Sequence, residues 1–291
     1  MTLQEVEDIF NRSLRFCFSK KKLCFVFPVL LVCGVLIIFC RAVSISASAW
    51  VVMSLSFMPV FLCTGILLAA GVLLIRMYYH EIKGMKVHFR KLLSHSLQSL
   101  IGASYLALPL ILSYLLLWTL MGVFLLLKGI PGIGDVISVL LAFGPFILVC
   151  ASLVLSFASL LVLFFVTPYV ALKNGVHLRI AEEIIAKMRA SAFMNIFLLM
   201  IGIAPLLICI GFLTLAAVMT DVHYLSATAP LGVSLEWFFI MVPFTLILTP
   251  FVIFFFNFAT ECYGLLQKKN KNSTSAVKVD KTEDEFCTAQ S

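Results

Sequence analysis

The chain has 291 residues, of which 62% are hydrophobic and only 12% are charged, and its mean hydropathy is +1.12. A soluble domain carries roughly 25% charged residues, so this composition excludes an ordinary soluble protein. The net charge of +7 does not indicate nucleic-acid binding, because the basic residues lie beside apolar runs and not in a polar domain of their own. Anionic lipid headgroups fit such residues better, at about 1 kcal/mol for each Lys or Arg near the surface.

The first part of the chain predicts a surface helix followed by two membrane spans. Residues 2–18 place apolar and charged side chains on opposite sides of a helix, and three lysines follow at 20–22. The uncharged run 23–40 is just long enough to cross about 30 Å of hydrocarbon. A serine-rich link then leads to a second predicted span at 50–75.

The middle of the chain continues this pattern. Residues 76–98 form a charged, amphipathic segment, which predicts a second surface helix, and a third span follows at 99–127. The next uncharged run, 136–172, is too long for one untilted span and short for two with a turn. It is interpreted as one span at 145–172, kinked or preceded by a surface segment.

A third amphipathic segment occupies residues 173–191 and is the clearest candidate for a membrane-surface or docking helix. Glu183 and Lys187 are in the favourable i, i+4 order. The candidate surface residues on its two sides are Arg179, Lys187 and Arg189, and Ile184, Ile185 and Met188.

Two further spans are predicted at 192–220 and 237–260. Residues 1–266 would thus form one transmembrane domain, and the polar residues 267–291 a disordered cytoplasmic tail.

The distribution of Lys and Arg indicates the orientation of the six spans. The segments 1–22, 76–98 and 173–191 and the tail carry 19 of the 21 Lys and Arg, whereas the segments between them carry only two. The positive-inside rule therefore predicts that both termini and all three surface helices are cytoplasmic.

The prolines suggest a threefold repeat of surface helix, span, short loop and span. Pro28, Pro109 and Pro205 lie in the odd-numbered spans, and Pro59, Pro145 and Pro243 in the even-numbered spans. Because proline is common in membrane helices, chance similarity is the competing explanation.

Polar residues inside the predicted spans are few. None of the six spans contains an ionisable residue, which argues against a proton-coupled or ion-coupled transporter. Asn195 and Asn257 are the most polar side chains there. They are candidates either for hydrogen bonds between helices or for binding a substrate. The nine cysteines form no CxxC pair, and HExxH, GxSxG and GxxxxGK[ST] are missing, so neither a metal, a cofactor nor a catalytic site is predicted.

Residues Thr167–Leu172 (TPYVAL) lead into a helix that ends with Arg189 and Ser191 before the next span. In this region, in the amphipathic N-terminal segment and in the basic surface segments, the chain resembles six-span bacterial membrane proteins of unknown function. These include the membrane domain attached to some glycerophosphodiester phosphodiesterases. The resemblance covers about residues 1–265 and implies a fold; the phosphodiesterase domain is not part of the similarity.

The sequence therefore predicts an all-α polytopic membrane helix bundle of six spans in three hairpins, in a bacterial inner membrane. The expected function is that of a non-enzymatic structural or regulatory protein, or of a complex subunit with a protein partner on the cytoplasmic face. A transporter or permease component for a small solute is the alternative. An intramembrane lipid enzyme is a third possibility, with candidates near the headgroups at His88, His95, Glu182 and Arg189.

Overall fold

The computed structural model describes residues 3–45, 47, 49–84, 107–120, 122–123, 143–172, 192–224 and 230–288. Within these ranges the chain is helical apart from short turns and has no strand. The predicted all-α class is thus confirmed.

The helices of the described residues are long and apolar. They are α1 (Leu3–Arg15), α2 (Lys20–Ser44), α3 (Ala49–Ile82), α6 (Gly144–Leu161), η1 (Val162–Val166), α7 (Thr167–Leu172), α9 (Ala192–Tyr224) and α10 (Pro230–Thr288). The π-helical segment η1 joins α6 and α7 into one continuous helix. Five helices are long and apolar enough to cross a membrane, and Ala107–Leu120 forms a shorter apolar helix. These features confirm a polytopic helical bundle.

Helices suit these sequences because a helix satisfies its own backbone hydrogen bonds, which no lipid could satisfy. Prolines are tolerated inside such helices, and Pro28, Pro59 and Pro205 lie within α2, α3 and α9. Pro145 instead occupies the first turn of α6, where its missing N–H costs nothing. The prolines of the proposed repeat therefore do not share one position within their helices.

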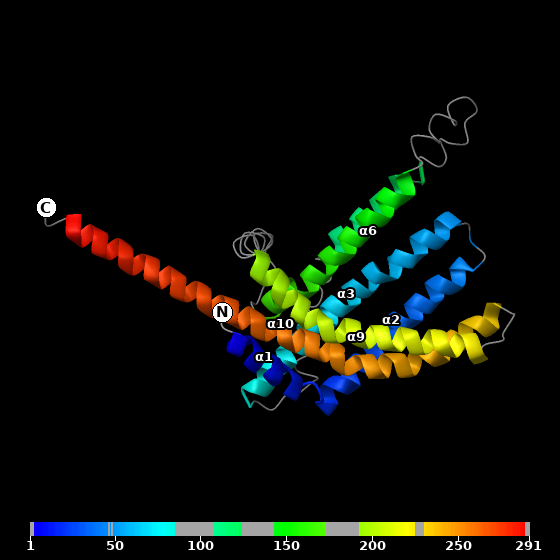
Figure 1. The fold of residues 1–291 in the computed structure, drawn as a ribbon, viewed down its shortest axis with the longest axis horizontal. Coiled ribbons are helices and arrows are strands. Elements are labelled where there is room, and N and C mark those ends of the chain that lie inside the picture. The colour runs from blue at the N-terminus through cyan, green and yellow to red at the C-terminus, as the bar shows by residue number, and fades with distance from the viewer. Residues whose placement is uncertain are drawn as a thin grey trace, which may run out of the picture.

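Figure 1 shows α2, α3, α9 and α10 running along one another, with α1 lying across α10 near one end of the bundle. We call this end the α1 end. The helices α2 and α9 begin there, and α3 reaches it at its last turns. The helix α7 also ends there, since its residue Ala171 contacts Arg76 of α3. Within the described residues, α2 and α3 are thus antiparallel, as are α9 and α10.

The main hydrophobic core lies between α3, η1, α9 and α10, with α1 and α2 packed against it. Aromatic side chains of α10 fill its centre, and Phe254, Phe256 and Phe258 are all buried. Small residues let the helices approach: a side chain added at Gly202 of α9 would meet Phe164 and Phe258 at 2.9 Å. A second, smaller core joins Phe61, Tyr114, Trp118 and Leu148.

The structure differs from the sequence-based segments at two places. Residues 76–82 continue the helix α3 and do not begin a separate surface helix; the chain turns only at Gly84, which has a positive φ of 64°. This part of the predicted surface helix 76–98 is therefore corrected. The reason is that Tyr78 is fully buried against the bundle.

The second difference concerns the C-terminal segment. The helix α10 continues to Thr288, through residues that the sequence assigns to a disordered tail, and it extends away from the bundle in Figure 1. Polar composition could not exclude a helix in this segment.

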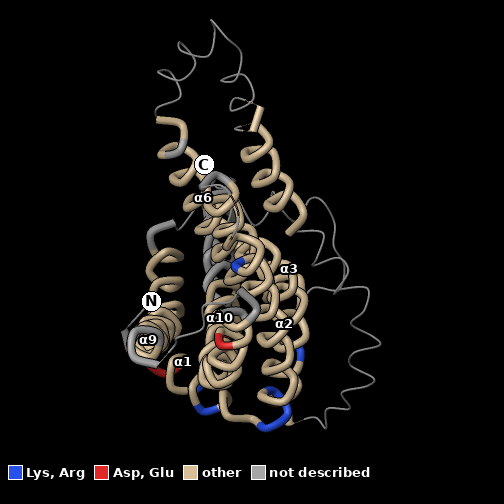
Figure 2. The backbone as a smooth tube through the Cα atoms, turned by 90° about the vertical axis from the view of Figure 1, so that its right-hand side faces the viewer, with Lys and Arg blue, Asp and Glu red and all other residues tan. Residues whose placement is uncertain are grey.

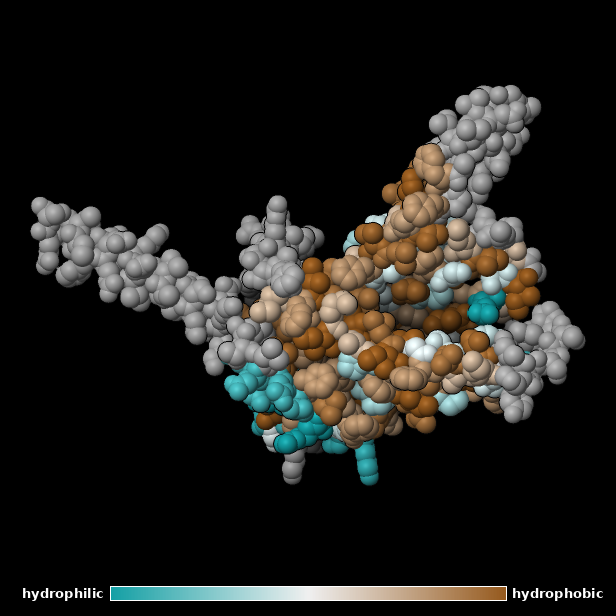
Figure 3. All heavy atoms as spheres, in the orientation of Figure 1, coloured by the Kyte–Doolittle hydropathy of each residue, from teal (hydrophilic) through white to brown (hydrophobic). Residues whose placement is uncertain are grey.

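Charged residues are sparse along the helices. Figure 2 shows long stretches without any Lys, Arg, Asp or Glu, and Figure 3 shows hydrophilic colours gathered around the α1 end, with hydrophobic colours along the sides. This distribution is the one expected when lipid surrounds the sides of a bundle and water reaches its end.

Candidate functional site

The most polar part of the described structure is a group of side chains at the α1 end, which we call the charge cluster. It consists of Arg12 on α1, Lys22 on α2, Tyr78 and Glu81 on α3, and Glu261 on α10. Four helices therefore contribute to it. Each of these residues lies within a turn or two of the end of an apolar run.

Lys22 is the centre of the cluster. It is 1% exposed, and its Nζ lies 2.6 Å from Oε2 of Glu81. The ammonium also lies 4.7 Å from the ring centre of Tyr78 and donates a 3.4 Å hydrogen bond to the carbonyl oxygen of Phe16. A buried ammonium is costly unless it is paired and hydrogen-bonded, and Lys22 has both kinds of partner.

A second connection joins α3 to α10 and α1. The hydroxyl of Tyr78 donates a 2.7 Å hydrogen bond to Oε1 of Glu261. The other carboxylate oxygen of Glu261 lies 3.6 Å from Nη1 of Arg12, whose side chain is 57% exposed. Because Arg12 is in contact with water, this ion pair contributes less than the buried pair of Lys22 and Glu81.

Arg76 extends the polar contacts to α7. Its Nε donates a 3.1 Å hydrogen bond to the carbonyl oxygen of Ala171, one residue before the end of α7. The last carbonyl groups of a helix lack partners within the helix and carry partial negative charge, so a guanidinium is a suitable partner for them. The contact fixes the end of α7 against α3.

Both asparagines singled out in the sequence are buried in the bundle. The Nδ2 group of Asn257 donates a 3.5 Å hydrogen bond to the carbonyl oxygen of Ser13, and so links α10 to α1. Asn195 is 5% exposed on α9. The α1 end also contains a cavity, between α1 and the last turn of α3, and neither asparagine lines it.

Cys17, in the turn between α1 and α2, binds the same carbonyl group as Asn257. Its Sγ donates a 3.0 Å hydrogen bond to the carbonyl oxygen of Ser13. Burial raises the pKa of the Cys17 thiol to about 12, although Lys22 and Asn257 act in the opposite direction. A thiol with so high a pKa is a poor nucleophile and a poor metal ligand at neutral pH. Within the described residues, no three His, Cys, Asp or Glu side chains are grouped as metal ligands.

Sequence reasoning missed the charge cluster because its members lie just outside the predicted spans. Lys22 directly precedes the span 23–40, Glu81 lies six residues after 50–75, and Glu261 directly follows 237–260. A usable signal was present, since the alternating topology brings all three positions to the same end of the bundle. Their opposite charges could then have predicted pairing.

The third amphipathic segment, residues 173–191, lies outside the described residues. Its candidate surface residues are Arg179, Lys187 and Arg189, together with Ile184, Ile185 and Met188. The candidates near the headgroups, His88, His95 and Glu182, also lie outside the described residues. Their assignment to the membrane surface stays a prediction.

The chemistry of the charge cluster is that of a structural joint. Its ionisable groups bind one another across four helices, and Lys22 is enclosed by protein. Comparisons of the chain with protein-family models, with curated proteins and with solved structures found no match. The resemblance to six-span bacterial membrane proteins therefore stays a prediction from the sequence.

Proposed function

We propose that the chain is a non-enzymatic, structural or regulatory subunit of a membrane complex, with its α1 end at the cytoplasmic surface of a bacterial inner membrane. The observation that carries this proposal is that the side chains of the charge cluster bind one another. Lys22, Glu81, Tyr78 and Glu261 contact one another and so join the ends of α2, α3 and α10. Side chains committed to such contacts stabilise a platform, whereas a catalytic group needs access to a substrate.

The surface of this platform offers cations to a partner. Lys20, Lys21 and Arg15 are exposed beside the cluster, while Lys22 and Arg12 contact carboxylates. An exposed basic surface favours acidic partners and increases the rate of association with them. The cytoplasmic partner of the proposal is therefore a protein with an acidic surface.

Affinity purification from membranes in a mild detergent tests the proposal. The wild-type chain should recover a partner in a fixed ratio, and the Lys20→Glu, Lys21→Glu double variant should recover less of it while remaining in the membrane fraction. Recovery that does not differ between the two chains would contradict a docking role for this surface. A reporter that is active only outside the cytoplasm, fused after residue 291, should be silent if the proposed orientation is right.

A permease component is the second candidate, and buried polar atoms within the spans favour it. The side-chain oxygens of Ser152, Thr167 and Asn257 are buried and have no hydrogen-bond partner among the described residues. Such atoms are suitable ligands for a small polar solute. A cysteine at position 257 in a cysteine-free chain distinguishes the two candidates, because a permease exposes it to a membrane-impermeant thiol reagent and a packed subunit does not.

A further inference from the structure

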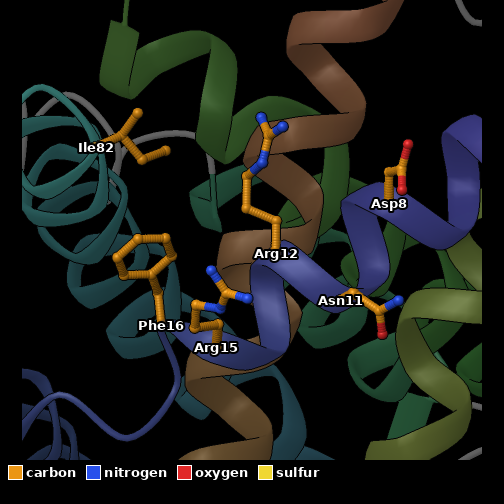
Figure 4. Close-up of a pocket in the computed structure, with 6 residues that line it drawn as sticks. All are labelled: Asp8, Asn11, Arg12, Arg15, Phe16 and Ile82. Atoms are coloured by element: carbon orange, nitrogen blue, oxygen red, sulfur yellow. The ribbon is translucent and has the colours of Figure 1, made fainter.

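The α1 end contains a cavity beside the charge cluster. Its volume is about 570 Å³, and it lies between α1 and the last turn of α3. Figure 4 shows two arginines in the middle of its lining, with an apolar pair on one side and two polar residues on the other. In that order the lining residues are Arg12 and Arg15, Phe16 and Ile82, and Asp8 and Asn11.

The charge of the lining fits a phosphodiester. Arg12 and Arg15 carry two positive charges and Asp8 carries one negative charge, so the lining has a net charge of +1. A guanidinium has five N–H donors, so the contact between Nη1 of Arg12 and Glu261 leaves further donors for a ligand. Guanidinium groups bind phosphate oxygens in bidentate geometry, which makes arginine the suitable residue for this ligand.

The other wall of the cavity is apolar. Ile82 is 46% exposed although it is the last residue of the apolar helix α3. Phe16 lines the cavity next to it and also packs its ring against Tyr78 at 5.8 Å. A free phosphate ion has no apolar atoms to place against this wall, whereas the glycerol esters and first acyl carbons of a lipid can cover it.

We propose that this cavity binds one glycerophospholipid, with its phosphate on Arg12 and Arg15 and its glycerol backbone against Ile82 and Phe16. The position agrees with this ligand, because the end of a membrane-spanning helix lies at the level of the headgroups. The inference rests on the membrane orientation proposed above, but not on a protein partner. Asp8 adds a preference: its carboxylate can accept hydrogen bonds from the ammonium of phosphatidylethanolamine, on the far side of the arginines from the apolar wall.

Binding of defined lipids to the purified chain in detergent, measured by native mass spectrometry, tests the proposal. Dioleoylphosphatidylethanolamine should bind in a 1:1 ratio, and Arg15→Gln should weaken its binding about tenfold, the effect of losing one charged hydrogen bond. Arg15 is chosen because Arg12 also contacts Glu261. The control is Lys21→Gln, which removes the same charge from an exposed position outside the lining and should leave the affinity unchanged.

Three further measurements identify the ligand. Dioleoylglycerol, which lacks the phosphate, should not bind in a 1:1 ratio, and millimolar inorganic phosphate should not displace the phospholipid. Ile82→Gln should weaken phospholipid binding several-fold without lowering the unfolding temperature, because Ile82 is half exposed.

Equal losses for Arg15→Gln and Lys21→Gln would overturn the site in favour of a general basic surface. Displacement by inorganic phosphate would overturn the lipid as the ligand, and tight binding of dioleoylglycerol would overturn the role of the arginines. None of these results bears on partner recovery from membranes, so failure of the lipid site and failure of the proposed function are distinguishable.

Discussion

In the half of the bundle next to α1 the helices bury more of their side chains against one another, whereas in the opposite half the same helices expose more of them. The contrast is visible within α9: Leu198 is completely buried, and Phe212, about four turns later, is 70% exposed. The continuous helix from α6 to α7 shows the same contrast, with Tyr169 buried near the α1 end and Phe146 72% exposed at the other. In Figure 1 α6 diverges from α9 and α10 toward that opposite half.

The contrast shows what holds a bundle together where hydrophobicity cannot. Lipid is as apolar as leucine, so helices in a membrane associate through close packing and polar contacts. Both are concentrated in the α1 half, in the phenylalanine-filled core, in the close approach at Gly202 and in the charge cluster. The opposite half contains a weaker contact, in which Arg41 of α2 lies 4.3 Å from the ring centre of Trp237 on α10.

The strongest test of this contrast removes the carboxylate of Glu81, which is the ion-pair partner of Lys22. Glu81→Ala leaves the ammonium of Lys22 buried without its ion-pair partner, and such a loss lowers the free energy of unfolding by about 3–5 kcal/mol. Thermal unfolding in detergent measures this loss as a lower midpoint. Combining Glu81→Ala with Lys22→Met should recover much of it, because no unpaired charge then remains. Glu7→Ala, on the exposed side of α1, is the control and should have almost no effect.

A packing test compares two glycines of α9. Gly202→Leu forces a side chain against Phe164 and Phe258, which should cost about 1–3 kcal/mol in the free energy of unfolding. Gly211, nearer the opposite half, has no atom within 4 Å of an added Cβ, so Gly211→Leu should change stability by less than about 0.5 kcal/mol. Similar unfolding midpoints for the two variants would mean that the halves are packed alike.

At the opposite end, loss of the cation–π contact should have a small effect. Arg41→Gln removes the cation beside Trp237 and should lower the free energy of unfolding by about 0.5–1 kcal/mol. Arg41→Lys keeps a cation there and is the matched control. A loss as large as that of Glu81→Ala would refute the distinction between the two ends.

A separate test, which follows a rate of modification and not a stability, concerns the Cys17 thiol and its dependence on pH. Its pKa of about 12, against an ordinary value of 9.0, makes its thiolate fraction at pH 8 about a thousandfold lower than that of an exposed cysteine. Maleimide should therefore modify a chain with Cys17 alone much more slowly than a cysteine-free chain carrying Gln4→Cys on the exposed side of α1. Comparable rates at pH 8 would show that the turn between α1 and α2 opens.

The raised pKa of Cys17 determines how its contribution to the free energy of unfolding changes with pH. The folded chain keeps the Cys17 proton at pH values where the unfolded chain releases it. The contribution of this group to stability is therefore complete below about pH 9 and is lost as the pH rises toward 12. Comparing the wild type with Cys17→Ala across this range isolates the contribution from that of other titrating groups.

Parts of the fold could be predicted because they depend on neighbouring residues. The apolar runs predicted helices at the positions of α2, α3, α9 and α10, and the structure has one helix at each of them. The end of α3 could not be predicted, since a charged sequence such as that from Arg76 to Lys83 continues a helix as readily as it leaves the membrane. The burial of Tyr78 decided it. The candidate site was missed for a similar reason: a lysine beside an apolar run is usually a solvated flank, and only its carboxylate partner on another helix makes Lys22 a core residue.

The sequence by itself determined the all-α class and the membrane character of this protein, because the length of an apolar run is read from contiguous residues. Only the tertiary structure decided which charges are buried, how α1 closes one end, and that the larger core lies in the half of the bundle next to α1. The hydrogen bond from Tyr78 to Glu261 joins positions 183 residues apart. No local pattern contains such a contact, because it exists only after the helices have packed.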